Sequence, residues 1–209
     1  MPNWCFINYK VVGKKEAAKR FTDMLDHLKS LPEPFVENGF WGGGEGKKGN
    51  NLWLGCIVNY LGGDWNAVHC RGVIDSYNLV DGRTADEGIV DVQLEHAWDE
   101  PSEFRKFLLE KYPDIRIVYR AEEGGNVLYK TNDATGEFFP EKYILQYEDE
   151  DGNCDTEYFV TLQTLAEYIQ DNGLAEKVEP DFGKITDALD KWEEEDDNRW
   201  YSVNEYDIA

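Results

Sequence analysis

The chain has 209 residues, a length that fits one domain or one domain with a sizeable extension. Hydrophobic residues make up 41% of it and aromatic residues 14%, a composition that excludes a disordered polymer. The net charge of -22 disfavours direct binding to nucleic-acid phosphates or to an anionic membrane, and it favours a partner with a basic surface.

The first 60 residues are expected to form a strand, a helix and a long loop. Alternation of apolar side chains predicts a strand over residues 4–12. Apolar residues spaced on one stripe predict a helix over residues 14–31, which Pro32 ends. Residues 32–50 are rich in Pro and Gly and predict a flexible loop, whereas residues 51–60 fit either a short helix or a strand.

The next elements complete a recurring arrangement. Residues 65–80 predict an irregular strand, and residues 88–98 alternate strictly enough to predict a second strand. Pro101 suits the first position of a helix over residues 101–112, and a strand is expected over residues 114–121. The order strand, helix, strand, strand, helix, strand is that of the ferredoxin-like split βαβ antiparallel sheet.

The remaining chain predicts a second group of elements. Three further strands are expected, at residues 126–131, 142–149 and 154–160. Asp151-Gly152 lies centrally between the last two strands, which is a strong hairpin signal. Thr161 can cap a helix, a last helix is expected over residues 182–196, and residues 199–209 are interpreted as a loose end.

These elements predict an α+β protein. Residues 1–130 would form a ferredoxin-like core domain that carries a Gly-rich loop over residues 38–50. Residues 131–209 would form an acidic β-hairpin and two-helix extension packed on that core. The charge follows this division, since residues 141–209 contain 21 acidic and 5 basic side chains and residues 1–140 contain 22 and 16.

Several segments resemble a known family. The chain begins Met1-Pro2-Asn3-Trp4-Cys5, and it later contains Trp98, Pro101 and Tyr112-Pro113-Asp114 in the same order as that family. Residues 59–66 keep only part of a further family segment. Over roughly residues 1–130 the chain is similar to the YubB-like, ferredoxin-domain family of plasmid- and phage-borne proteins. The resemblance implies a ferredoxin-like fold and a mobile-element origin, and it implies no catalytic residues.

Residues 44–49 match the pattern G-x-G-x-x-G of dinucleotide-binding loops. That mechanism needs a preceding strand and a following helix whose N-terminus meets the pyrophosphate, and this run follows a Pro-rich loop instead. We therefore expect no nucleotide or other cofactor here. A mobile loop that presents Trp41 to a partner is the better interpretation.

Residue types that commonly bind metals or carry out catalysis are scattered along the sequence and form no recognisable motif. The four cysteines include no Cys-x-x-Cys pair, and three histidines suggest no catalytic triad. Gly152 lies fourth from Asp149, whereas a calcium-binding EF-hand loop needs its glycine at position six, so a β-turn is the better interpretation. We expect mostly buried, reduced thiols, a hydrogen-bonded core His96, and no metal.

Two acidic segments run against what folding favours. Across a turn at Asp151, Glu148 is expected to face Asp155, and like charges opposite each other destabilise a sheet. Residues 193–197 are all acidic at the end of an expected helix, where the helix dipole disfavours negative charge. Such conflicts often mark function, although a solvated acidic face is the alternative. The candidate partner-binding residues are these acids and one loop tryptophan: Glu148, Asp149, Glu150, Asp151, Asp155, Glu157, Glu193, Glu194, Glu195, Asp196, Asp197 and Trp41.

These patterns favour a non-enzymatic acidic binding protein that engages a protein with a basic surface. With the mobile-element origin that the resemblance implies, we expect a counter-defence inhibitor or a DNA mimic in the cytoplasm of a bacterial host. One alternative is a small-molecule-binding domain or enzyme that uses the Gly-rich loop and the open sheet face. The other is a structural protein that self-associates through that face.

Overall fold

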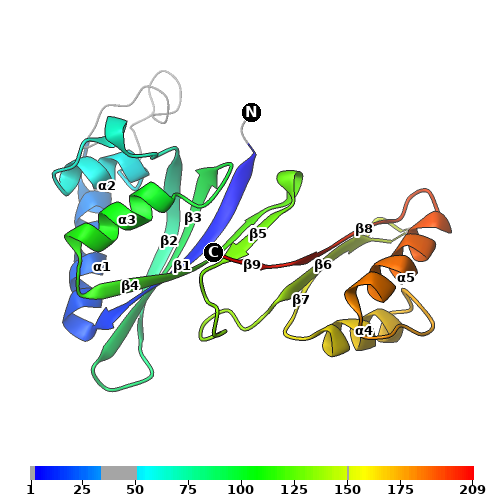
Figure 1. Ribbon diagram of the computed structural model, residues 1–209. Helices are drawn as coiled ribbons and strands as arrows, with labels where there is room; N and C mark the ends of the chain where they lie inside the picture. The colour runs from blue at the N-terminus through cyan, green and yellow to red at the C-terminus, as the bar shows by residue number, and fades with distance from the viewer. Residues whose placement is uncertain (1–2, 34–50, 150) are drawn as a thin grey trace. The chain divides into compact units, whose positions relative to one another are not determined.

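The computed structural model in Figure 1 describes residues 3–33, 51–149 and 151–209. The chain divides into two compact units, Met1–Asn132 and Asp133–Ala209, which we call the N-terminal unit and the C-terminal unit. Both units combine helices with antiparallel strand pairs, so the predicted α+β class is confirmed. Most of the expected loop, with Trp41, and the acidic residue at position 150 lie outside the described residues.

In the N-terminal unit the strand order is β2-β3-β1-β4-β5, with antiparallel pairing throughout this series. Helices α1, α2 and α3 lie on one face of the sheet (Figure 1). The elements are β1 (Trp4–Lys14), α1 (Lys15–Ser30), α2 (Leu54–Tyr60), η1 (Trp65–Ala67), β2 (Gly72–Asp81), β3 (Glu87–Ala97), α3 (Ser102–Lys111), β4 (Ile115–Glu123), η2 (Gly124–Asn126) and β5 (Leu128–Thr131).

One hydrophobic core fills the space between this sheet and its helices. Along β1, Cys5, Ile7, Tyr9 and Val11 are each at most 1% exposed and belong to the same cluster as Phe21 of α1. Successive side chains of a strand point to opposite faces, so the alternation in β1 turns one apolar row toward the helices. The central strand therefore carries much of the contact between the two layers.

The segment with ambiguous sequence signals forms a short helix and then an irregular strand. Residues 54–58 of α2 are all buried, so this helix has no polar face from which its period could be read. The Asp64 side chain caps η1 by accepting from the Asn66 amide at 2.9 Å. Strand β2 begins only at Gly72, later than expected, and its pairing with β3 shifts at Asp75, which forms a bulge.

The C-terminal unit has its own sheet and its own core. The strand order is β7-β6-β8, and the buried cluster joins Leu145 of β6 to Leu165 of α4 and Leu189 of α5. Thr161 caps α4 as the sequence predicts, because its hydroxyl accepts from the Thr164 amide at 3.2 Å. The elements are β6 (Tyr143–Glu148), β7 (Cys154–Phe159), α4 (Leu162–Asp171), α5 (Phe182–Glu194), β8 (Trp200–Glu205) and β9 (Asp207–Ile208).

The expected register of the β6–β7 hairpin is wrong. Glu148 pairs with Cys154, and Asp155 lies opposite Tyr147, so Glu148 and Asp155 do not face each other. The reason is a longer loop, in which the amide of Asp149 donates to the carbonyl of Asn153 at 3.1 Å. The Asp149 carboxylate also accepts from the backbone amide of Asn153 at 2.9 Å, which fixes the loop from inside.

The expected loose end over residues 199–209 is also wrong, because these residues contain β8 and β9. Strand β8 pairs with β6 along its whole length, and it turns the expected hairpin into a three-stranded sheet. Its inward side chains Tyr201 and Val203 pack against the core of the C-terminal unit. Two apolar residues among polar ones are too short a pattern to identify a strand.

The buried position of Leu145 allows a test of the second core. Leu145 is fully buried, and we expect Leu145→Ala to lower the free energy of unfolding by about 2–5 kcal/mol, because it leaves a cavity. Leu79→Ala is the control, since Leu79 on β2 is 42% exposed and its loss should cost far less. Chemical denaturation of both variants measures the difference, and equal losses would contradict the described C-terminal core.

Candidate functional site

The turn between β3 and α3 has an unusual backbone conformation. Trp98, directly after β3, has a φ angle of +76° and is 50% exposed. A left-handed conformation is unusual for a bulky side chain and persists only where the surroundings fix it. Here the Trp98 amide donates to the carbonyl of Asn3 at 2.9 Å. Strained residues of this kind cluster at functional sites, so the turn marks a candidate site.

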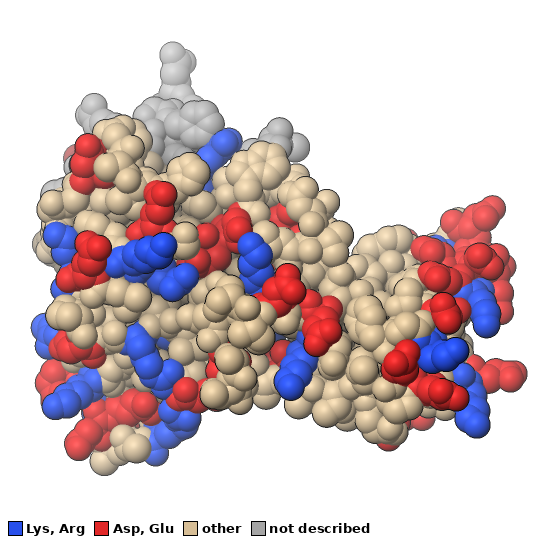
Figure 2. Space-filling view, in the orientation of Figure 1, with Lys and Arg blue, Asp and Glu red and all other residues tan. Residues whose placement is uncertain are grey.

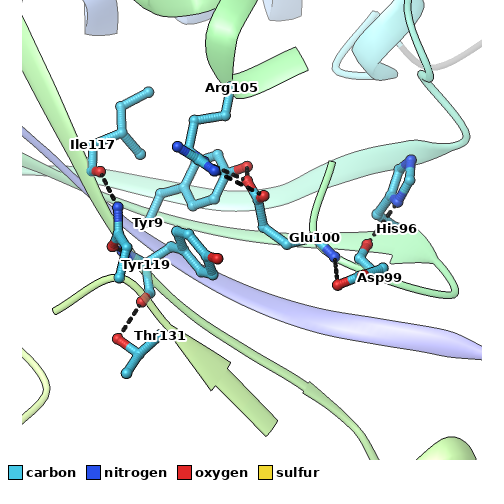
Figure 3. A network of polar contacts seen from close by, with 9 residues as sticks. Tyr9, His96, Asp99, Glu100, Arg105, Ile117, Tyr119 and Thr131 are labelled. Carbon is cyan, nitrogen blue, oxygen red and sulfur yellow. Dashed lines mark hydrogen bonds and ion pairs between the residues drawn. The ribbon is translucent and has the colours of Figure 1, made fainter. Parts of the chain in front are cut away.

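Two residues further on, Glu100 places a carboxylate in the protein interior. Its side chain is 3% exposed and forms an ion pair with Arg105 of α3, whose Nε lies 2.8 Å from one carboxylate oxygen. The hydroxyl of Tyr9, on β1, donates to the same oxygen. The Arg105 guanidinium also lies over the ring of Tyr119 on β4, 4.9 Å from its centre (Figure 3). The buried charge is therefore neutralised by Arg105 of α3 and receives a further hydrogen bond from Tyr9 of β1.

The two tyrosines of this network, Tyr9 and Tyr119, are not bases. Burial raises the pKa of Tyr9 well above its usual value, and the neighbouring Glu100 carboxylate raises it further. Burial also raises the pKa of Tyr119, again assisted by Glu100. Both phenols stay protonated near neutral pH, so the network holds the turn in place and offers no phenolate for chemistry.

Asp99 links the turn to β5 and to β3. One of its carboxylate oxygens accepts from the amide of Glu100 at 2.7 Å, and the other pairs with the ammonium of Lys130 at 2.8 Å. Its backbone carbonyl accepts from Nδ1 of His96 at 2.8 Å (Figure 3). The charge of Asp99 is thereby neutralised, and its backbone sets the orientation of a neighbouring imidazole.

His96 is the residue of this site whose bonding is incomplete. A carbonyl can only accept, so the hydrogen bond to Asp99 assigns a proton to Nδ1 and leaves Nε2 of the neutral ring as an acceptor. His96 is 5% exposed, and its Nε2 has no hydrogen-bond partner among the described residues. Burial lowers the pKa of His96, an effect that the bond to Asp99 opposes and the nearby His69 reinforces. The ring is therefore neutral near pH 7.

A half-open cavity of about 260 Å³ lies beside this turn. The backbone amide of His69 donates to the carboxylate of Glu103 at 2.9 Å, which connects two of its walls, and the rings of His69 and His96 are 6.3 Å apart. The volume is near the lower end of ligand pockets in proteins, so it suits a small group. The cavity is lined by His69, His96, Ala97, Trp98, Asp99, Glu100, Pro101, Ser102 and Glu103.

Across the described ranges, no three His, Cys, Asp or Glu side chains come together as a metal site, and no helix there is long and apolar enough to cross a membrane. Three of the four cysteines are buried, as expected, and Cys154 is exposed. Burial raises the pKa of Cys5 and of Cys70 to about 12, so both thiols stay protonated. Neither is an activated nucleophile.

The acidic candidates belong to the C-terminal unit, and the structure brings their two segments together. Glu148 ends β6, and it pairs with both Cys154, which begins β7, and Trp200, which begins β8. The β6–β7 loop and the turn that follows α5 therefore lie at the same end of this sheet. Hydrogen bonds from Asn153, together with the charge of Arg199, hold the pKa of Asp149 below its usual value, which fits this proximity.

Some acids of the two segments, residues 148–157 and 193–199, already have partners, and Asp155 accepts from the hydroxyl of Tyr168 at 3.2 Å. Glu195 pairs with Arg199 at 3.0 Å, and the Asp196 carboxylate accepts from the Asn198 amide at 2.9 Å. Exposed acids of the same end include Asp151, Asp155, Glu194 and Asp197. Figure 2 shows acidic side chains gathered over the turn between α5 and β8. We call this surface the acidic end.

Comparison with protein-family models, with curated proteins and with solved structures produced no match to this chain. The candidate site is therefore argued from its geometry.

Sequence reasoning used Trp98 and Pro101 as part of a family resemblance and missed the cavity that both residues line. It predicted a hydrogen-bonded core His96, which is correct for Nδ1 but not for Nε2. Two signals pointed to the site: an acid directly before Pro101, and the polar tip of Tyr9 on the inward row of β1. A buried phenol needs a partner, and Glu100 supplies it.

The Glu100 network predicts a specific loss of stability. Glu100→Gln keeps the size of the side chain but leaves the Arg105 charge without its buried counter-ion. We expect the free energy of unfolding to fall by about 2–3 kcal/mol. Glu110→Gln, at an exposed position on the same helix as Arg105, is the matched control and should change little. Chemical denaturation checks both, and equal effects would contradict the network.

His96 predicts a contribution to the pH dependence of stability. Its pKa is lowered below 6.5 in the folded protein, whereas an unfolded chain binds the proton at about 6.5. As the pH falls through 6.5, the unfolded chain binds a proton before the folded protein does. The free energy of unfolding therefore decreases between pH 6.5 and the pKa of folded His96. Between about pH 7.5 and about pH 5.5, His96→Asn should lose less stability than the natural protein. Nitrogen NMR showing Nε2 protonated at pH 7 would contradict this assignment.

Proposed function

We propose that the protein is a non-enzymatic binding protein that engages a basic protein surface through the acidic end of its C-terminal unit. The observation that carries the proposal is that two acidic segments, far apart in the chain, meet at one end of the β7-β6-β8 sheet. Their residues are the partner-binding candidates, with Trp41 as a further proposed contact.

The balance of charge supports this proposal. The C-terminal unit, residues 133–209, has 23 acidic and 5 basic side chains, so most of its carboxylates have no basic side chain available within the unit. In residues 148–157 and 193–199 the single basic residue is Arg199, which already donates to Glu195 and to the carbonyl of Trp192. A concentrated field of one sign attracts an oppositely charged partner and speeds its association.

The N-terminal unit manages its charge differently. Its 20 acidic side chains are accompanied by 16 basic ones. Exposed ion pairs join Lys19 to Asp23 and Arg20 to Asp114, which leaves a surface of mixed sign (Figure 2). The contrast favours the C-terminal unit as the part that meets a basic partner.

The proposal also includes the origin of the protein in a mobile element and its role against host defence. We propose that the N-terminal unit is a ferredoxin-like split βαβ domain, a topology supported by the order β2-β3-β1-β4 with α1 and α3 as connections. With the resemblance to the YubB-like family, this supports a mobile-element protein in a bacterial cytoplasm. A counter-defence inhibitor or DNA mimic would use the acidic end in place of a phosphate backbone.

A second candidate is a small-molecule-binding domain. The cavity beside Trp98 favours it, because a strained turn and a buried acceptor on His96 meet there. The cavity belongs to the N-terminal unit, so this candidate is tested separately from the acidic end.

The role of the acidic end in partner binding can be tested with two triple variants that lose the same number of negative charges. Asp151→Asn, Glu194→Gln and Asp197→Asn together remove three exposed carboxylates from it. The control removes three exposed carboxylates of the same unit that lie outside both acidic segments, by Asp171→Asn, Glu176→Gln and Glu179→Gln. We expect the first variant to bind the partner about five- to tenfold more weakly, since each exposed charge contributes roughly 0.3–0.5 kcal/mol.

The partner is first selected from a bacterial host lysate with the full chain at low salt, and its affinity is then measured over a range of salt concentrations. Affinity should fall steeply as salt rises, and less steeply for the acidic-end variant. Equal weakening by both triple variants would mean that net charge alone attracts the partner. Unchanged affinity of the acidic-end variant would refute the proposed interface.

A further inference from the structure

We propose that the cavity beside Trp98 is a binding site for a primary ammonium group, which would contact His96, Trp98 and Glu103. This inference goes beyond the proposed function, because the cavity lies in the N-terminal unit and shares no residue with the acidic end. The ammonium group could belong to a free alkylamine or to a lysine side chain of another protein.

The first argument is the acceptor on His96. Its Nδ1 proton is committed to the Asp99 carbonyl, so Nε2 can only accept a hydrogen bond in the neutral ring. The residue is 5% exposed and lines the cavity, and this nitrogen has no described partner. A buried acceptor without a partner is costly, so a ligand that donates an N–H to it gains free energy.

The second argument is the sign of the charge. Asp99 is paired with Lys130 and Glu100 with Arg105, so these two carboxylates add little net charge. Figure 3 shows Glu100 extending toward Tyr9 and Arg105, with His96 on the other side of Asp99. Glu103 is exposed, and the His69 amide donates to one of its oxygens. Its negative charge in the first turn of α3 offsets the attraction of that helix end for anions.

The third argument is the aromatic wall. Trp98 is half exposed, and its left-handed backbone holds the indole at the cavity. Cations are attracted to the face of an indole, more strongly than to the rings of Tyr or Phe. An ammonium group has three donors on one nitrogen and can satisfy an imidazole and a carboxylate together. The exposed ring of His69 would turn aside to admit it, because Nε2 of His96 is closed to solvent.

The test uses n-butylamine as the probe, with n-butanol as the neutral analogue of the same length. The full chain, labelled with nitrogen-15, is titrated with each probe, and the His96 Nε2 resonance is followed by NMR. We expect butylamine to shift this resonance in a saturable way and butanol to bind at least about tenfold more weakly. Binding of butanol as tight as that of butylamine would overturn the assignment of a cation site.

Variants locate the site. His96→Asn keeps a donor in the place of Nδ1 and removes Nε2, and it should weaken butylamine binding about tenfold. Glu103→Gln should weaken butylamine binding several-fold. The matched control Glu110→Gln should not, although Glu110 lies on the same helix and is also exposed. An equal loss in the two glutamine variants would overturn the proposal, since it would indicate attraction by overall charge.

A further variant keeps the test decisive if His96→Asn does not fold. Trp98→Gly removes the indole at a position whose φ angle of +76° suits glycine, so the fold should be retained. We expect it to weaken butylamine binding about fivefold, and unchanged binding would overturn the role of Trp98.

The source of the ammonium group is resolved by a second ligand. A decapeptide with one central lysine is compared with the same peptide in which that lysine is acetylated. Binding of the first at least about tenfold tighter than butylamine, and lost on acetylation, assigns the site to a lysine of a partner protein. Binding of butylamine as tight or tighter assigns it to a small amine. Absence of binding by both ligands overturns the proposal.

Discussion

A carboxylate with the burial of Glu100 needs a counter-charge and hydrogen-bond donors, because transfer of an isolated charge from water is far too costly. The N-terminal unit supplies them from elements that are distant in the chain: Tyr9 from the central strand and Arg105 from α3. This requirement fixes where α3 begins relative to β1. The left-handed backbone of Trp98 and the orientation of His96 lie in the turn so defined, and the cavity forms beside it.

The two units illustrate two ways of carrying charge on a small protein. The N-terminal unit pairs several exposed acids with nearby bases, and its buried Glu100 carboxylate has a dedicated arginine. The C-terminal unit has far more acidic than basic side chains, 23 against 5, and collects many of the acids at one end of its sheet. Salt should therefore affect the two units differently, since screening weakens exposed ion pairs in the first and relieves repulsion in the second.

The sequence predicted those elements whose side chains alternate or repeat over many residues. β1 is one example, with apolar side chains from Cys5 to Val11, and α4 with its Thr161 cap is another. The sequence did not predict elements that depend on a contact with a distant strand or on a hydrogen bond inside a loop. The hairpin register depends on the Asp149 carboxylate inside the loop, and β8 depends on pairing with β6. Nε2 of His96, which has no partner among the described residues, is an acceptor because a carbonyl three residues later accepts from Nδ1 of the same ring.

The central place of β1 has a consequence for how the chain is made. This strand pairs on one side with β3, which begins at Glu87, and on the other with β4, which begins at Ile115. On the ribosome, β1 emerges long before either partner and cannot complete its hydrogen bonds until more than a hundred residues have followed. Helix α1 is the one neighbour available early, and its apolar stripe can cover the inward row of β1 during that interval. Contacts of such long sequence separation also slow folding, so we expect the N-terminal unit to complete its sheet late in synthesis.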